Sequence, residues 1–263
     1  MGEALQEFVS QAQHLAPTFD SQTVFAIGGW NISQYTLYMF IILALVLLMV
    51  LVGARKLQMI PHSKPTAILE YLYGFVGDSI GRDVIGEGFK QHIPFLATLF
   101  IFILTANFIG LIPGSKAATG TISITWALSL ISFIYFNFYG FKKLGLGGYL
   151  KSICPSAVPG PMKPIIWAME AFSLILRLLT LAVRLYGNML AGHMILGVFS
   201  IATTVFMQYT FLMNGGLATG VTGIVWFALL LFMYSLETLV AFLQAYVFAI
   251  LTSSYIGMAV HPH

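Results

Sequence analysis

Residues 165–213 read IIWAMEAFSLILRLLTLAVRLYGNMLAGHMILGVFSIATTVFMQYTFLM, an almost continuously apolar run. A helix that crosses a bilayer perpendicular to its plane needs only about 20 residues. A second long apolar run, residues 221–258, follows a turn at Asn214, Gly215 and Gly216. Since apolar backbone in lipid must satisfy its own hydrogen bonds, both runs are expected to be helical. Their length predicts a strongly tilted helical hairpin.

The composition of the whole chain agrees with a membrane location. Of its 263 residues, 59% are hydrophobic and only 8% are charged, whereas a soluble domain carries about 25% charged residues. The apolar runs are continuous, which favours helices over the alternating strands of a membrane β-barrel. The single Cys154 excludes a disulfide scaffold. A net charge of +3 spread over scattered loops gives no basic stripe for a nucleic acid.

The apolar segments divide the chain into five predicted spans. They are residues 35–54, 93–112, 122–141, 165–213 and 221–258. The sequence thus predicts an all-α integral membrane protein with one transmembrane domain, residues 35–263, behind an N-terminal segment of residues 1–34. Residues 64–90 carry charges among apolar residues spaced three and four apart, which is typical of an amphipathic helix on the membrane surface.

The basic residues set the expected orientation. Nine of the twelve fall on one predicted side: Arg55, Lys56, Lys64, Arg82, Lys90, Lys142, Lys143, Lys151 and Lys163. The positive-inside rule then places the N-terminus outside and the C-terminus in the cytoplasm. No secretory or transit signal is recognisable at the N-terminus, which favours a bacterial plasma membrane, although a chain encoded in an organelle would lack such a signal as well.

Four charged residues are expected inside the membrane after residue 165. They are Glu170, Arg177, Arg184 and Glu237, and each charge costs about 2.5 to 3.5 kcal/mol at mid-bilayer. On a helix the first three form one stripe, because residues seven apart differ by only about 20° in direction. His193 is nine residues beyond Arg184 and points about 180° away from it. His193 and Glu237 are expected at similar depth across the hairpin, where an imidazole and a carboxylate can contact each other.

Three motifs carry a resemblance to a known family. They are LAVRLYGNMLAGH at residues 181–193, NFIGLIPG at residues 107–114 and LQAYVF at residues 243–248. The chain resembles the a subunit of F-type ATP synthases, from the first span to the C-terminus. The resemblance implies a stator protein with one copy per complex, whose tilted hairpin faces the rotating c-ring. The implied partners are the c-ring, the b subunits of the peripheral stalk and the bilayer.

The resemblance also implies roles for individual residues. Arg184 corresponds to the family's indispensable arginine, a permanent positive charge that promotes proton release from c-ring carboxylates and blocks a direct leak between two half-channels. The other pathway candidates are Glu170 and Ser173 at the cytoplasmic exit, Asn188 and Gln244 near the junction, and His193 and Glu237 in the inlet. Cofactors and metals are not implied, and neither is an enzymatic activity of this chain.

Two departures from the family pattern bear on the inlet. Many members place the acid on the earlier helix and the histidine on the later one, whereas here His193 comes first and Glu237 second. The start of the third span, residues 119–123, lacks the Asp and Asn of many members. The sequence leaves open which of His193 and Glu237 hands on the proton, and whether protons or sodium ions are carried.

Secondary transporters, ion channels and intramembrane proteases would each show a sequence pattern of their own. A secondary transporter would show paired repeats around a midplane site, and an ion channel would build its filter from symmetric copies. Neither pattern is visible, so both remain alternatives without a motif. An intramembrane metalloprotease would need a zinc motif such as H-E-x-x-H, which the sequence lacks.

Overall fold

The structure is a computed structural model, and it describes residues 2–13, 23–27, 30–55, 64–86, 88–112, 114–115, 117–152, 162–212 and 217–260. Five of the described helices are long and apolar enough to cross a membrane. They are α3 (Gln34–Arg55), α6 (Ile93–Gly110), α7 (Ile122–Ser152), α8 (Lys163–Leu212) and α9 (Leu217–Val260). These helices confirm the predicted all-α membrane class.

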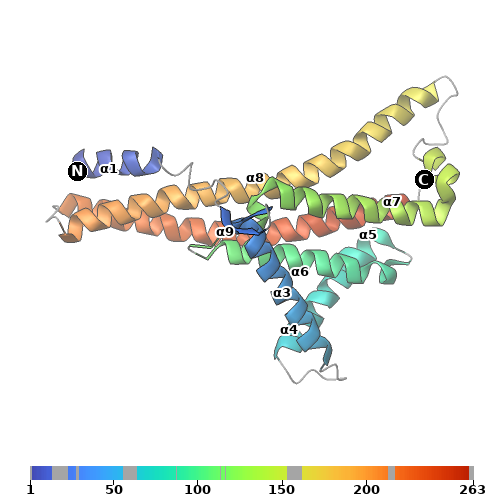
Figure 1. Ribbon diagram of the computed structural model, residues 1–263, viewed down its shortest axis with the longest axis horizontal. Coiled ribbons are helices and arrows are strands. Elements are labelled where there is room, and N and C mark those ends of the chain that lie inside the picture. Colours follow the sequence, from blue (N-terminus) through green and yellow to red (C-terminus); the bar gives the residue numbers. More distant parts are fainter. Residues whose placement is uncertain are drawn as a thin grey trace.

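The two last helices form the long axis of the molecule. Helix α8 has 50 residues and α9 has 44, and they lie side by side over most of their length (Figure 1). At a rise of 1.5 Å per residue α8 is about 75 Å long, more than twice the thickness of a bilayer core of about 30 Å. The first part of α8 bends away from α7 and α9 (Figure 1). Apolar residues such as Ile165 and Met169 therefore stay exposed there.

Helix α6 lies at the centre of the core. Of its apolar window 56% is buried, against 11% for α8 and 6% for α9. Its residues Leu96, Phe100 and Ile103 pack against buried side chains of α3 and α9, including Ile42 and Phe248. The long hairpin thus leaves most of its surface for lipid or for other chains, while α6 fixes its position.

The segment predicted as one amphipathic helix over residues 64–90 is broken into shorter pieces. Helix α4 (Lys64–Val76) continues as a π-helical turn, η1 (Gly77–Arg82), and a three-residue α5 (Asp83–Ile85). Gly86 then adopts a φ of 75°, a backbone conformation that glycine adopts without steric cost. The hydroxyl of Ser253 on α9 donates to the carbonyl of Ile80 at 3.1 Å, which ties the π turn to α9.

Helix α7 runs beyond the predicted span of residues 122–141. It reaches Ser152, with a kink at Gly145, where φ is 70°. Residues 142–145 still belong to an apolar window long enough for a membrane, although Lys142 and Lys143 close the apolar run in the sequence. Helix propensity continues through these lysines, because lysine is a good helix former.

The N-terminal segment contains structure that the sequence analysis does not predict. Helix α1 (Gly2–Gln13) packs against α8, and the ring of Phe8 lies 6.2 Å from that of Trp226. Strands β1 (Thr23–Ile27) and β2 (Trp30–Ser33) pair antiparallel. The backbone N–H of Thr36 donates to the hydroxyl of Ser33 at 3.3 Å, so Ser33 caps α3.

Candidate functional site

Arg184 lies on a face of α8 that the described part of this chain leaves uncovered. Its side chain is exposed, whereas Leu181 and Leu185, about 60° and 100° around the helix from it, are buried. Thr180 and Ala191 lie within about 40° of Arg184 around the helix and are also exposed. No described residue forms a hydrogen bond or an ion pair with Arg184. The guanidinium is therefore presented outward from a largely apolar helix.

Arg177, one step earlier on the predicted stripe, has a partner within the chain. Its guanidinium carbon lies 5.3 Å from the centroid of the Tyr255 ring on α9, in a cation–π arrangement. Glu170 and Ser173 are half-buried and lie on the first part of α8. Glu170 is 23 residues before His193, or about 35 Å along the helix. The structure thus keeps the predicted exit residues apart from the predicted inlet.

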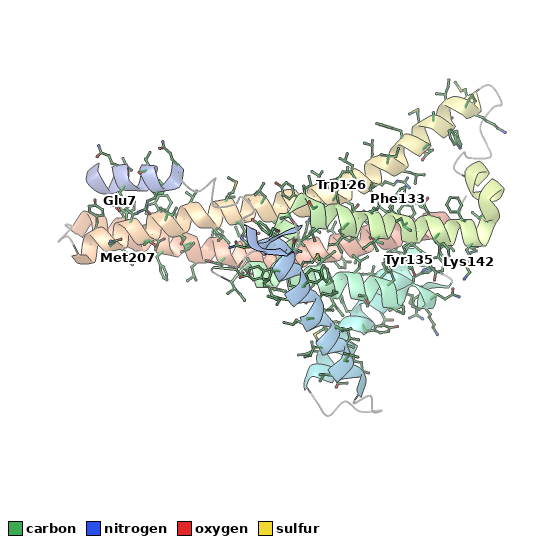
Figure 2. The ribbon with its side chains drawn as sticks, in the orientation of Figure 1. Glu7, Trp126, Phe133, Tyr135, Lys142 and Met207 are labelled. Carbon is green, nitrogen blue, oxygen red and sulfur yellow. The ribbon has the colours of Figure 1, made fainter. Side chains whose placement is uncertain are left out.

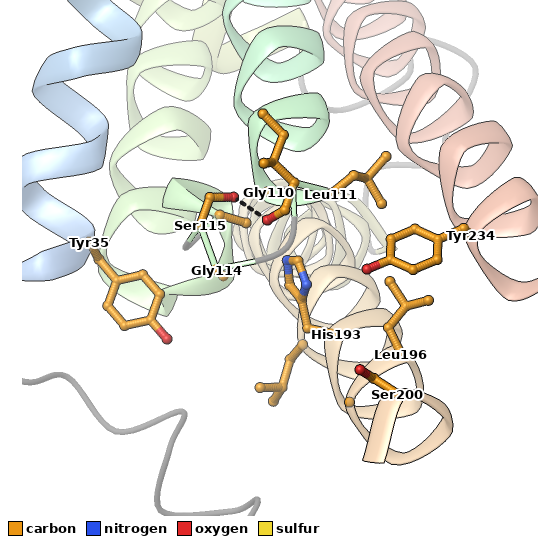
Figure 3. Close-up of a pocket in the computed structure, with 14 residues that line it drawn as sticks. Tyr35, Gly110, Leu111, Gly114, Ser115, His193, Leu196, Ser200 and Tyr234 are labelled. Atoms are coloured by element: carbon orange, nitrogen blue, oxygen red, sulfur yellow. Dashed lines mark hydrogen bonds between the residues drawn. The ribbon is translucent and has the colours of Figure 1, made fainter. Parts of the chain in front are cut away.

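A cavity of about 220 Å³ opens beside His193, which points into it (Figure 3). Residues of α3, of the loop after α6, of η3 (Ala118–Gly120) and of both long helices line it. Its polar lining residues are Tyr35, Ser115, His193, Ser200 and Tyr234. Tyr234 lies three residues before Glu237, so the two side chains share a face of α9. The cavity can hold water next to a titratable imidazole.

Glycine 192 makes room for the carboxylate of Glu237. A Cβ built on Gly192 would overlap both carboxylate oxygens and the carboxyl carbon of Glu237. The acid from α9 therefore sits directly on the backbone of α8, at the residue next to His193. The structure thus brings Glu237 and His193 to the same level of the hairpin, as their spacing predicts, and the contact that it records is between Glu237 and Gly192.

Two buried polar atoms near this level lack a hydrogen-bond partner among the described residues. They are Oε1 of Glu237 and Nδ2 of Asn188. A buried polar group left unsatisfied costs about 1 to 3 kcal/mol, so such groups in a native structure are usually completed by water, by an ion or by another chain. Asn188 lies only about 40° around α8 from Arg184, so its amide lies between the cavity and the exposed arginine.

A buried hydrogen-bond pair connects α6 to α9 beside Glu237. The Asn107 amide donates from Nδ2 to the carbonyl of Ala241 at 3.1 Å and accepts at Oδ1 from the hydroxyl of Thr119 at 2.8 Å. All three residues are fully buried. Ala241 lies one turn after Glu237 and three residues before Gln244. The pair therefore fixes the stretch of α9 that carries both pathway candidates.

Gly110 at the end of α6 permits a second close approach. A Cβ on Gly110 would collide with the side chain of Ala117 and would lie 3.2 Å from Nε2 of His193. The hydroxyl of Ser115 holds the same turn by donating to the carbonyl of Ile112 at 2.8 Å (Figure 3). The motif at residues 107–114 thus contributes both the buried amide and the space beside the imidazole.

Several lining residues were not singled out from the sequence. Tyr35, Ser115 and Ser200 come from segments with no common sequence pattern, so only the tertiary structure brings them to the cavity. Tyr234 could have been found from its spacing of three to Glu237. Asn107 belongs to the motif at residues 107–114, which by itself assigns no role to this residue. Among the described residues, no cluster of three or more His, Cys, Asp or Glu side chains could hold a metal ion.

Comparison with known families agrees with this geometry. The family model described as ATP synthase A chain matches residues 36–257. This chain belongs to that family. The match extends from the second residue after the start of α3 to near the end of α9. It therefore includes Arg184, the Asn107 pair and every lining residue of the cavity except Tyr35.

Individual relatives of the family give the same result. The chain is 36% identical over 249 residues to the ATP synthase subunit a of Rhodopseudomonas palustris strain BisA53, which covers 92% of this chain and 96% of that protein. It is 43% identical over 197 residues to the ATP synthase subunit a of Brucella ovis, with 74% and 76% covered. The same values hold for the protein of Brucella suis. Family membership thus rests on nearly full-length similarity.

Proposed function

We propose that this chain is the stator a subunit of an Fo motor. In this role it provides two proton half-channels and one fixed arginine, which together couple proton translocation to rotation of a c-ring and so to ATP synthesis or hydrolysis. The chain contributes transport and no catalysis of its own. Its partners are the c-ring and the b subunits of the peripheral stalk, with one copy of this chain in each complex.

The observation that carries the proposal is the setting of Arg184. The side chain is exposed on a membrane helix and has no ion-pair partner among the described residues. It lies 21 residues from the start of α8, or about 32 Å, and still farther from the end. A charge left in lipid at such a position is unfavourable, so a carboxylate of another chain is the partner that would stabilise it.

A guanidinium in this position has two effects on an arriving ring carboxylate. Because arginine stays protonated in proteins, it favours the ionised form of the acid and so drives proton release. The same positive charge opposes a proton that would pass directly between the half-channels. Protons then cross only while they are bound to the carboxyl groups of the rotating ring, which makes translocation depend on rotation.

The inlet half-channel is assigned to the packed face of the hairpin. The cavity beside His193 and Tyr234 can admit water, and Glu237 sits one residue from His193 on the backbone of Gly192. Asn188 and Gln244 complete the route toward the ring, and the buried unsatisfied amide of Asn188 supports this place. Imidazole and carboxylate groups are the usual proton relays in such paths.

The exit half-channel is assigned to Glu170 and Ser173 near the start of α8. This assignment rests on their position far from the His193 cavity and on the basic residues at the same predicted side. With the N-terminus outside, the exit opens to the cytoplasm of a bacterial cell whose plasma membrane holds the complex. The inlet then opens to the outside.

The proposal is tested with Arg184→Ala in inverted membrane vesicles that contain the assembled complex. ATP-driven proton pumping, followed with a pH-sensitive dye, is expected to fall at least about 100-fold, since a neighbouring positive charge changes the proton-dissociation constant of a carboxyl group by about one to three decades. Arg177→Gln is the matched control, because Arg177 already has Tyr255 as a partner. Pumping by Arg184→Ala at the rate of the control would refute the role.

A further inference from the structure

Two hollows lie next to each other where α6 begins and α7 leaves its span. One has a volume of about 290 Å³ and the other about 490 Å³. The first is lined by Gly88, Gln91, His92, Tyr139, Lys142, Lys143 and Val260. The second is lined by Arg82, Gly86, Gly88, Phe89, Lys90 and Gln91. They share Gly88 and Gln91, so they form one continuous basic surface, called here the basic hollow.

The described charged residues that line the basic hollow are all basic, and Asp78 and Asp83, which lie near Arg82 in the sequence, are not among its lining residues. Four basic side chains line it, and none of the described lining residues carries a carboxylate; Glu87 lies outside the described residues. Lys142 and Lys143 are exposed. The ammonium of Lys142 lies 5.8 Å from the centroid of the Tyr139 ring, which holds it near the opening.

The floor of the hollow is an ordered aromatic cluster. His92 is only 4% exposed, and its Nδ1 is 3.1 Å from the hydroxyl of Tyr135. Its ring meets that of Tyr139 edge-on at 4.6 Å, and Tyr135 stacks on Phe95 at 3.7 Å. Burial lowers the pKa of His92 below its usual 6.5, so His92 is neutral at neutral pH and the lysines and Arg82 supply the positive charge.

The hollow lies at the level where a membrane surface is expected. The apolar window of α6 begins at Ile93, directly after His92. Tyrosines concentrate at the boundary between lipid and water, and Tyr135 and Tyr139 follow each other by one turn toward Lys142 on α7. Figure 2 shows Tyr135 and Lys142 close to the same end of the molecule. A ligand in the hollow would have its charged group in water and its apolar part against Tyr, Phe and Val side chains.

We propose that the basic hollow binds the phosphate headgroup of an anionic phospholipid such as phosphatidylglycerol. The lysines, Arg82 and the Gln91 amide are suited to phosphate oxygens. The adjacent apolar surface of α6 and α7 is suited to the acyl chains, which a free phosphate ion does not have. This inference requires only that the hollow faces a membrane surface, and it does not depend on the role of Arg184 or on proton transfer.

The test uses the assembled complex in nanodiscs of phosphatidylcholine with a small fraction of photoactivatable phosphatidylglycerol. The probe is expected to crosslink to this chain, and the double variant Lys142→Gln with Lys143→Gln is expected to reduce the yield about tenfold or more. The matched control loses the same charge elsewhere, through Lys64→Gln with Lys163→Gln, and is expected to keep the wild-type yield. Lys142→Arg with Lys143→Arg should also keep it.

A competition experiment separates the two possible sources of phosphate. Inorganic phosphate at millimolar concentration should leave the crosslink unchanged if a lipid occupies the hollow. Displacement of the probe by inorganic phosphate, or equal yields in the Gln double variant and the Lys64 and Lys163 control, would overturn the proposal. Should the double variant fail to assemble, Lys143→Gln alone is used, with an expected reduction of about threefold or more and an unchanged yield as the contradicting result. None of these readouts uses proton pumping, so their outcome is independent of the proposed function.

Discussion

The two faces of α8 differ sharply although one helix carries both. On one face Arg184 is exposed and has no ion-pair partner among the described residues. On the opposite face His193 lines a cavity, because a helix places residues nine apart on opposite sides. Gly192, which lies against the Glu237 carboxylate, is about 80° around the helix from Arg184. The helix backbone itself therefore lies between the permanent charge and the imidazole. The comparison shows that one helix can direct a permanent charge and a titratable imidazole to opposite sides, as the proposed function requires.

The largest effect within this comparison is expected from Gly192→Ala. The new methyl group would occupy the place of the Glu237 carboxylate, which is the end of a flexible side chain and can swing away without unfolding the hairpin. Alanine also favours the helix over glycine by about 1 kcal/mol. We therefore expect a stable complex whose ATP-driven pumping is reduced about tenfold or more, which corresponds to about 1.4 kcal/mol, because the carboxylate leaves its place beside His193.

Gly74→Ala is the matched control for this substitution. Gly74 lies within α4, away from the Arg184 face and the cavity, and a Cβ there meets nothing within 4 Å. It gains the same methyl group and the same helix propensity but should pump at nearly the wild-type rate. Equal loss of pumping in both variants would show that the effect does not come from the contact between Glu237 and Gly192.

A smaller effect is expected from Asn107→Leu, which removes the bonds to Ala241 and Thr119. Leucine has the same number of side-chain heavy atoms and the same branching as asparagine but leaves a buried hydroxyl unsatisfied, at a cost of about 1 to 3 kcal/mol. The purified complex should lose this chain at a lower temperature in a thermal-stability assay, and pumping should fall only severalfold. Ser129→Ala is the control on α7, since its hydroxyl bonds the Leu178 carbonyl at 2.6 Å outside the site. Thermal release no earlier than in that control would argue against the Asn107 pair as a fixing point.

Much of the fold followed from the sequence, because membrane helices are dictated by length and apolarity. The class and the five apolar helices were predicted from the continuous runs. The opposite directions of Arg184 and His193 followed from helical spacing alone. The break in residues 64–90 did not, because the π turn depends on a bond from Ser253, 173 residues away from Ile80.

The site was only partly predictable for a similar reason. The number of residues from the turn predicted that His193 and Glu237 lie at the same depth in the hairpin. The position of the Glu237 carboxylate against Gly192, however, depends on how closely the backbones of α8 and α9 approach each other. Tyr35 and Ser115 reach the cavity only through the packing of α3 and of the loop after α6. The motif at residues 181–193 separated Arg184 from Arg177 in the sequence, but the partner of Arg177, Tyr255 on the last helix, appears only in the structure.

The most direct measurement asks what lies against the Arg184 face. In a background with Cys154→Ser, a cysteine is introduced by Thr180→Cys, on the exposed face one turn from Arg184, or by Met189→Cys, which is buried on the packed side. Each is paired with a cysteine beside the membrane carboxylate of the ring subunit, and disulfide formation is measured in membranes. The account predicts a crosslink from Thr180→Cys and none from Met189→Cys. Crosslinking that is absent from Thr180→Cys, or that comes from Met189→Cys instead, would contradict the claim that Arg184 faces the ring.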